Sequence, residues 1–361
     1  MVARQQEAFV RHYVTHCCNQ DGEPSDPSEH IAQNHVNDVL NDIRVAFSRH
    51  KHPSLDKRFR AKYADPRLDS EHLENQTWKV EKNGFDKATM VEWVVSACPE
   101  DVLREIWLQL VPPILLILDD YMVVYKRRGV FLIHSLVSRV DADVITNTGL
   151  EKVFFETLLK CLLYVTNEED VPLLEEAYPC IMDLITKTRL PDTKERAQLF
   201  QKVMTDAVIR GLTYAGDKLS HVKALLSPVE RLYTELGCLG VQYLNRIVPA
   251  LSDALCLTPR SKRNAAHVRE VNYIAVKALM TVIKTCWPRI PSYRGRILKG
   301  LATCWLQYYS NKNMDPKHDA EMIGLLQETF KLLKEASREH IKPDVEALLN
   351  YNSDIFLPLV H

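Results

Sequence analysis

The sequence predicts an all-α protein, a HEAT/armadillo-like α-solenoid of antiparallel helix pairs. Apolar residues recur at helical spacing through most of the 361 residues, which is typical of amphipathic helices. The expected helices form pairs that start about every 40–50 residues, a period typical of such arrays. Only 11 glycines are present, whereas β-rich folds and nucleotide-binding α/β folds depend on glycine in turns and phosphate loops.

The first 84 residues are expected to form two regions that precede the repeats. Residues 1–50 carry N-terminal helices with apolar stripes. Residues 51–84 are charged and interrupted by proline, so we expect a mostly irregular linker in which Trp78 is the one large anchor. The helices expected in the first region cover residues 2–18 and 29–49, and Ser28 is expected to cap the second.

The helical-repeat array is expected to span residues 85–350, and residues 351–361 are expected to form a C-terminal tail. One helix pair cannot bury both of its apolar stripes, whereas pairs stacked side by side bury them in a continuous core. A helix at 86–98 opens the array and a short helix near 343–350 closes it. The pairs between them are 101–119 with 122–139, 150–165 with 170–188, 193–213 with 219–237, 241–257 with 265–286, and 292–310 with 317–338.

The charge and cysteine content limit the class of protein. The 46 basic and 47 acidic residues give a net charge of -1, which argues against nucleic-acid binding and against an anionic membrane surface. The nine cysteines are an odd number and are scattered, as in reduced proteins of the cytoplasm or nucleus. Since the longest apolar runs fall short of the ~20 residues that span a bilayer, we expect no membrane contact. We therefore expect a cytoplasmic protein, with the nucleus as a second location.

No motif in the sequence indicates a reaction, a cofactor or a metal. The phosphate-binding glycine patterns, the GxSxG elbow and the HExxH zinc pattern are all absent from the sequence. His12, His16 and Cys17 share one stretch of helix, but no CxxC completes a four-ligand zinc site. We therefore expect a protein that is not an enzyme.

The stretch 111–140 carries the sharpest local pattern, a helix, a tight turn and a second helix. Asp119 and Asp120 stand in the turn, and we expect Asp120 to accept hydrogen bonds from free N–H groups where the second helix starts. Adjacent residues project in different directions, which argues against an acid/base pair. Lys126 and Gly129 stand where a HEAT unit places a basic partner for the turn acid and a small residue for close helix approach.

Two clusters are candidates for partner binding, each with a structural alternative. The basic residues between two expected helices either form a solvated loop or bind an acidic partner. The aromatic residues near the end of the expected helix 292–310 either anchor an interface or pack between repeats. The basic cluster comprises Arg260, Lys262 and Arg263, and the aromatic cluster comprises Trp305, Tyr308 and Tyr309.

One combination of motifs resembles a known family. QTWK at 76–79, a helix containing Trp93, P-x-x-L-x-x-L-D-D at 112–120 and K-x-x-G at 126–129 together resemble the Tel-two-interacting protein two family, over about residues 70–310. The resemblance implies a helical-repeat scaffold without catalytic residues, the smallest subunit of the TTT co-chaperone complex. In that family, Asp119, Asp120, Lys126 and Gly129 would support the fold.

The resemblance also implies the partners. These are the larger HEAT-repeat subunits of the TTT complex and, indirectly, the heat-shock chaperone system and the phosphatidylinositol-kinase-related protein kinases whose folding, stability and assembly the complex supports. Two other functions stay open on the residues alone. One is a HEAT-repeat adaptor for transport, and the other is an adaptor associated with nucleic acid.

Overall fold

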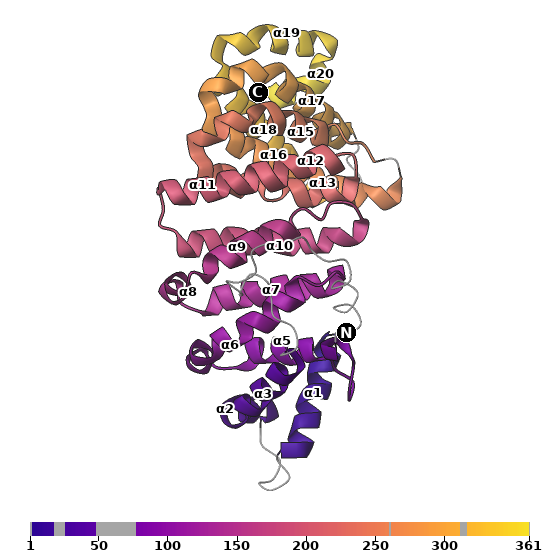
Figure 1. Ribbon diagram of the computed structural model, residues 1–361. Coiled ribbons are helices and arrows are strands. Elements are labelled where there is room, and N and C mark those ends of the chain that lie inside the picture. The colour runs from indigo at the N-terminus through magenta and orange to yellow at the C-terminus, as the bar shows by residue number, and fades with distance from the viewer. Residues whose placement is uncertain (1, 18–25, 48–76, 260, 311–315, 361) are drawn as a thin grey trace, which may run out of the picture. The chain divides into compact units, whose positions relative to one another are not determined.

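The computed structural model describes residues 2–17, 26–47, 77–259, 261–310 and 316–360. Every regular element in these ranges is a helix and none is a strand, which confirms the predicted all-α class (Figure 1). The chain divides into two compact units. Unit 1 is Met1–Cys161 with Pro179–Thr188, and unit 2 is Leu162–Tyr178 with Arg189–His361.

The N-terminal helices belong to unit 1 and are not a region apart from the repeats. The single helix expected at 29–49 is two helices that meet at His35. Asp26, rather than Ser28, caps the first of them, because its Oδ1 accepts from the N–H groups of Ser28 and Glu29 at 2.9 and 3.1 Å. The helices are α1 (Val2–Cys17), α2 (Pro27–Asn34) and α3 (Val36–Phe47), all packed against α5 (Lys87–Ala97).

The rest of unit 1 is built around one antiparallel helix pair, α6 and α7. Their facing stripes are fully buried and consist of aliphatic side chains such as Ile114, Leu118 and Ile133. The short helix α8, which the sequence analysis did not expect, ends at Gly149 with a left-handed backbone (φ 71°). The elements are η2 (Thr77–Lys79), α6 (Glu100–Leu118), α7 (Val123–Arg139), α8 (Ala142–Thr148), α9 (Leu150–Cys161) and the second half of α10 (Val171–Thr188).

Unit 2 contains the first half of α10 and the helices that follow it. The helix expected at 219–237 is divided at Pro228, and the helix expected at 193–213 contains a π-helical segment, η4. The elements are η3 (Glu168–Asp170), α11 (Lys194–Lys202), η4 (Val203–Ile209), α12 (Arg210–Ala215), α13 (Leu219–Leu226), α14 (Val229–Leu236), η5 (Gly237–Tyr243), α15 (Leu244–Leu255), α16 (Lys262–Cys286), η6 (Trp287–Tyr293), α17 (Arg294–Ser310), α18 (Pro316–Ser337), η7 (Arg338–Ile341), α19 (Lys342–Tyr351) and α20 (Ser353–Val360).

The segment expected as a C-terminal tail contains helix α20. Its Phe356 and Leu359 are buried, and α20 packs against α17 and α18. The expected linker at 51–84 lies mostly outside the described residues, but its anchor Trp78 is buried in unit 1.

Hydrogen bonds join positions one repeat apart. Lys187 Nζ donates to the Ser138 carbonyl, 49 residues away. In unit 2, Gln307 Nε2 donates to the Leu257 carbonyl and Trp305 Nε1 to the Ile355 carbonyl, each 50 residues away. The Ser138 and Leu257 carbonyls lie at or just beyond the C-terminal ends of α7 and α15, where backbone carbonyls lack partners within the helix. The three bonds mark a repeat of about 50 residues, slightly longer than the ~40–47 residues typical of HEAT units.

Candidate partner-binding site

The turn between α6 and α7 carries the residues that the sequence singled out. Asp120 is buried, and its Oδ1 accepts a hydrogen bond from the Met122 N–H at 2.8 Å. Lys126 Nζ donates to the Leu118 carbonyl at 2.8 Å, so it serves a carbonyl in the last turn of α6. The exposed Asp119 ends α6 as its C-cap. Side-chain hydrogen bonds from Asp120 and Lys126 therefore stabilise the turn at the start of α7 and at the end of α6.

Gly129 sets the distance between α6 and α7. A Cβ atom at this position would lie 2.6 Å from Leu118 Cα and 2.7 Å from Leu118 N. Backbone atoms cannot give way as the end of a flexible side chain can, so no larger residue fits without moving a helix. Gly129 allows the close approach that its place in the sequence predicts.

Lys79 of η2 joins the upstream tryptophan motif to this turn. Its Nζ lies 2.5 Å from Asp120 Oδ2, a carboxylate with a fully buried side chain. The same ammonium lies 4.4 Å from the ring centre of Tyr121 and 5.0 Å from that of Tyr125, within cation–π distance. Trp78 beside it packs edge-on against Tyr125. The QTWK motif at 76–79 and the acidic turn at the end of the 112–120 motif therefore contact each other directly.

Arg128 of α7 is the centre of a buried charge cluster with α5. Its Nη1 donates to Asp86 Oδ2 at 2.7 Å, and its Nε donates to Glu92 Oε1 at 2.5 Å. Its Nη2 donates to Thr89 Oγ1 at 2.9 Å. Asp86 also accepts from the Thr89 N–H at 2.7 Å and so caps α5. Tyr125 adds a further hydrogen bond to Asp86 at 3.0 Å.

The pKa values of this cluster follow from the balance of burial and charge. Burial raises the pKa of Asp86, but the hydrogen bonds and charge of Arg128 outweigh it, so this pKa lies below its ordinary value. At Glu92 burial prevails over Arg128, so this pKa lies above its ordinary value. Burial lowers the pKa of Arg128, but Glu92 and Asp86 together raise it. The guanidinium stays charged and bound on several sides, so the cluster joins two helices and presents no reactive group to solvent.

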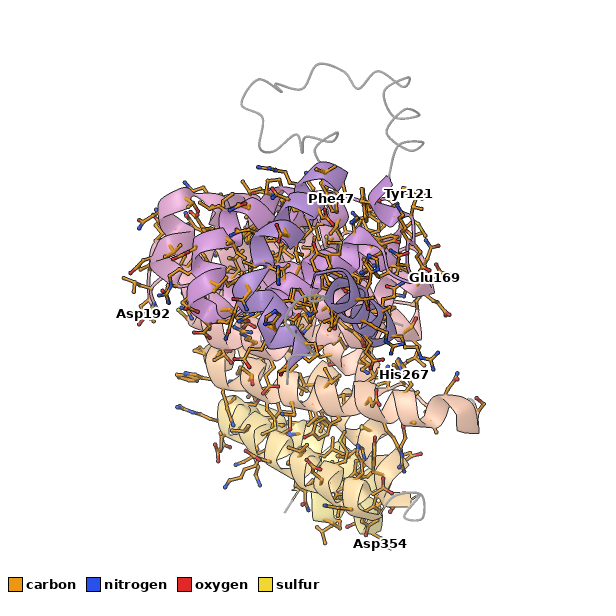
Figure 2. The ribbon with its side chains drawn as sticks, turned by 90° about the horizontal axis from the view of Figure 1, so that it is seen from below. Phe47, Tyr121, Glu169, Asp192, His267 and Asp354 are labelled. Carbon is orange, nitrogen blue, oxygen red and sulfur yellow. The ribbon has the colours of Figure 1, made fainter. Side chains whose placement is uncertain are left out.

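The fastened turn and α7 present an apolar patch to solvent. We define the α7 patch as Tyr121, Met122, Val124 and Phe131, of which Val124 is 66% exposed and Phe131 is 48% exposed. Val124 and Phe131 stand seven residues apart on one face of α7, at a separation of about 10 Å. Figure 2 shows Tyr121 at the rim of the molecule. Exposed aromatic and aliphatic residues on a rigid helix are typical of protein interfaces.

The aromatic cluster near the end of α17 is not such a surface. Trp305 is fully buried, and its indole N–H donates to the Ile355 carbonyl of α20, 2.9 Å away. Tyr308 is buried as well, with His318 of α18 stacked on its ring and Arg269 of α16 over it. Tyr309 is half-buried and stacks on Trp305. Core packing, the alternative left open by the sequence, therefore accounts for Trp305 and Tyr308, and the proposed partner role for them is withdrawn.

The basic cluster has no described side chains. Lys262 and Arg263 begin α16, but their side chains, and all of Arg260, lie outside the described residues. Their role in partner binding stays a prediction.

The described residues contain no group of three or more His, Cys, Asp and Glu side chains placed to hold a metal ion. Within the same ranges, no helix has both the length and the apolar character needed to cross a bilayer.

The charged residues that join α7 to α5 were not predicted from the sequence. Arg128 lies within the basic run 126–128, and a run of charges is usually a solvated face. Its partners Asp86 and Glu92 stand 42 and 36 residues away. A charged residue on the side of α7 that also carries buried Leu132 was the one signal in the sequence.

Stacked helix pairs, joined by an internal charge cluster whose groups are all paired, define a helical-repeat protein. The chain belongs to the Tti2 family, whose model matches residues 2–259. The match starts nearer the N-terminus than the motifs indicate, and it ends before α16.

Two individual proteins are similar to the chain. TELO2-interacting protein 2 of Mus musculus is 26% identical over 243 residues. The matched region is 64% of this chain and 43% of the mouse protein, so the chain corresponds to less than half of that relative. A solved structure of Kap95p binding to RanGDP gives a TM-score of 0.47 at 9% identity, over 99% of this chain and 47% of the solved chain. At that TM-score the likeness adds nothing to the assignment.

Proposed function

We propose that this chain is a non-enzymatic scaffold subunit of the TTT complex and that it binds a larger helical-repeat subunit. The observation that carries the proposal is membership of the Tti2 family over residues 2–259. The name of the mouse relative, TELO2-interacting protein 2, supports a protein partner. Through this assembly the chain supports the folding, stability and assembly of phosphatidylinositol-kinase-related protein kinases with the heat-shock chaperone system, in the cytoplasm and the nucleus.

The α7 patch is the surface that we assign to the larger subunit. Its helix is held on one side by Gly129 against α6 and on another by Arg128 against α5. A surface fixed in this way loses little conformational entropy when a partner binds. The patch also lies within the segment 76–140 whose motifs carry the family resemblance.

The test is co-expression of the tagged chain with the larger TTT subunits, followed by measurement of the affinity of the purified complex. The wild-type chain is expected to form a stoichiometric complex. Phe131→Glu is expected to weaken it at least about tenfold, because a carboxylate then replaces an apolar anchor. Leu108→Glu is the matched control, since Leu108 is an equally exposed residue of α6 in the same unit.

Two outcomes would contradict the proposal. A wild-type chain that stays a monodisperse monomer beside the larger subunits would exclude the scaffold role. Equal affinities for Phe131→Glu and wild type would exclude the α7 patch. Thermal melting of both variants is measured alongside, and Phe131→Glu is expected to melt as wild type does, because Phe131 contributes little to the core.

A further inference from the structure

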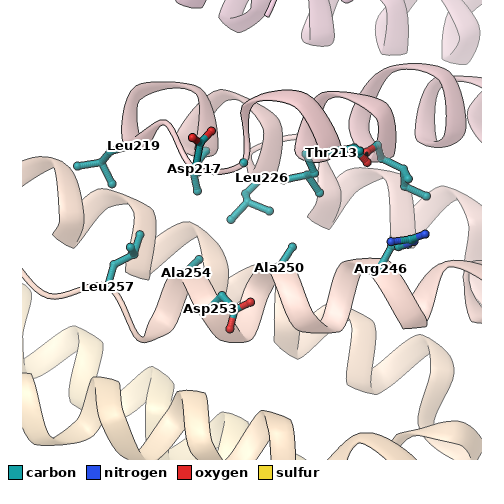
Figure 3. A pocket seen from close by; sticks show the side chains of 13 residues that line it. Thr213, Asp217, Leu219, Leu226, Arg246, Ala250, Asp253, Ala254 and Leu257 are labelled. Atoms are coloured by element: carbon teal, nitrogen blue, oxygen red, sulfur yellow. Dashed lines mark hydrogen bonds between the residues drawn. The ribbon is translucent and has the colours of Figure 1, made fainter.

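Unit 2 contains an apolar groove that the α7 patch does not involve. It lies between α12 and α13 on one side and α15 on the other, with a volume of about 380 Å³ (Figure 3). Most of its lining is aliphatic, and several of these side chains are only half-buried, so the groove is open to solvent. The aliphatic residues are Ile209, Leu212, Leu219, Val222, Leu226, Ala250, Ala254 and Leu257.

The floor of the groove is one face of α15. Arg246, Ala250 and Ala254 follow one another at intervals of four residues, so they share this face. They extend over about 12 Å of helix, at 1.5 Å per residue. Ala254 is already covered within unit 2, at 3% exposed. Ala250 is half-buried, so its small side chain leaves room for the ridge of another helix to approach the α15 backbone closely.

The two ends of the groove differ in charge. Arg246 stands at one end, and Asp217 stands on the opposite wall toward the end marked by Leu219 and Leu257 (Figure 3). Within the described residues no carboxylate lies at ion-pair distance from Arg246. Asp253 also lines the groove, but its carboxylate accepts from Arg296 Nη2 with both oxygens at 2.7 Å. The groove therefore offers one cation, Arg246, and one anion, Asp217, to an occupant.

The walls decide which kind of chain can occupy this groove. They consist of helices whose backbone groups are already bonded within the helix, so an extended peptide would find no strand edge for its own N–H and C=O groups. Those groups would then be buried unpaired, at a cost of several kcal/mol in total. A helix satisfies its own backbone and presents only side chains, which is the requirement of an apolar groove.

We propose that this groove binds an amphipathic helix of a partner protein, two to three turns long, with apolar residues on the face that meets the half-buried Ala250. The occupant carries an acidic side chain at the end that meets Arg246 and a basic one near Asp217. The π-helical segment η4 ends at Ile209, a residue of the groove wall, and π-helical turns are frequent at functional sites.

This inference rests on the proposed function, because the probe is the larger helical-repeat subunits of the TTT complex, co-expressed with the full chain. A photoreactive amino acid at Ala250 is expected to form an adduct with a partner segment that is apolar at every third or fourth residue and acidic at one end. Ala250→Trp fills the groove and is expected to weaken the complex by about tenfold or more. Arg246→Glu is expected to weaken it as well. Ala320→Trp, at an exposed position of α18, is the matched control and is expected to bind as wild type.

The outcomes separate this inference from the function on which it rests. If the wild-type complex forms, but the Ala250 probe gives no adduct and Ala250→Trp binds as tightly as Ala320→Trp, the groove is not a docking site and the scaffold role stands. An adduct between two copies of the chain would overturn the inference in the same way. If the wild-type complex does not form, the proposed function and the groove inference both fail. Thermal melting of Ala250→Trp at the wild-type temperature shows that lost binding is not lost folding.

Discussion

Replacing Arg128 by methionine tests whether the buried charge cluster fixes α7 to α5. The carboxylates of Asp86 and Glu92 are each only 2% exposed in their side chains, and Arg128 is 11% exposed. Methionine keeps most of the side-chain volume but removes the cation, so two carboxylates stay buried without a counter-charge. Removing one partner of a buried ion pair typically costs ~3–5 kcal/mol. We expect Arg128→Met to lose that much of the free energy of unfolding near neutral pH.

The pH dependence of this loss gives a sharper test. In the wild type, the pKa of Asp86 is lowered, so its contribution is present above the unfolded pKa and is lost as pH falls through the folded pKa. Glu92 affects stability in the opposite direction. Because its pKa is raised, its buried charged form destabilises the fold, and this destabilisation is relieved as pH falls. Without Arg128, burial raises the pKa of both carboxylates, so the variant regains stability on acidification. The difference in the free energy of unfolding between the wild type and Arg128→Met is therefore expected to decrease from about pH 7.5 to about pH 5.

Urea denaturation at each pH measures the effect, with Arg104→Met as the matched control. Arg104 pairs with Asp141 at 2.9 Å, but both side chains are more than half exposed, so the control is expected to cost at most ~1 kcal/mol. If Arg128→Met cost no more than Arg104→Met, or if its deficit grew on acidification, the cluster would not hold the helices as described.

Gly129→Ala is expected to cost ~1–3 kcal/mol in thermal or urea unfolding, since its methyl group would meet the Leu118 backbone. Gly324→Ala, in open space on helix α18, is expected to gain ~0.5–1 kcal/mol, and equal effects at the two sites would contradict the close approach of α6 and α7. Lys79→Met leaves Asp120 buried without its ammonium partner and is expected to lower stability by ~3–5 kcal/mol. A melting temperature equal to that of wild type would show that the two motifs are not linked through this pair.

The spacing of residues predicted the contacts within one helix–turn–helix. It did not predict which segments far apart in the sequence bury each other's side chains. The turn contact of Asp120 with Met122 and the close approach of Gly129 to Leu118 were correctly placed, because these residues are close by in the sequence. The ion pair of Asp120 with Lys79, 41 residues upstream, was not predicted. The partner of Arg128 at Asp86 is 42 residues away, and periodicity does not identify which distant helix supplies a counter-charge.

The positions at which expected helices are interrupted were also not predicted, because they depend on packing between helices. The helix expected at 219–237 contains Pro228. In the structure, α13 ends before Pro228 and α14 starts after it. At α17 the incorrect prediction was a partner-binding role for Trp305. An aromatic cluster is compatible with either a surface anchor or core packing, and the sequence does not show that α20 covers Trp305.

The cover that α20 places on Trp305 has a consequence for shortened forms of this protein. A premature stop codon before Ser353 would remove Phe356 and Leu359 from the core and leave the Trp305 indole N–H without the Ile355 carbonyl. The shortened chain would expose a large aromatic surface on its last complete repeat, and such a surface is a site for aggregation and for recognition by chaperones and proteases. Loss of the last helix would therefore lower the cellular abundance of the protein while leaving the sequence of the α7 patch intact.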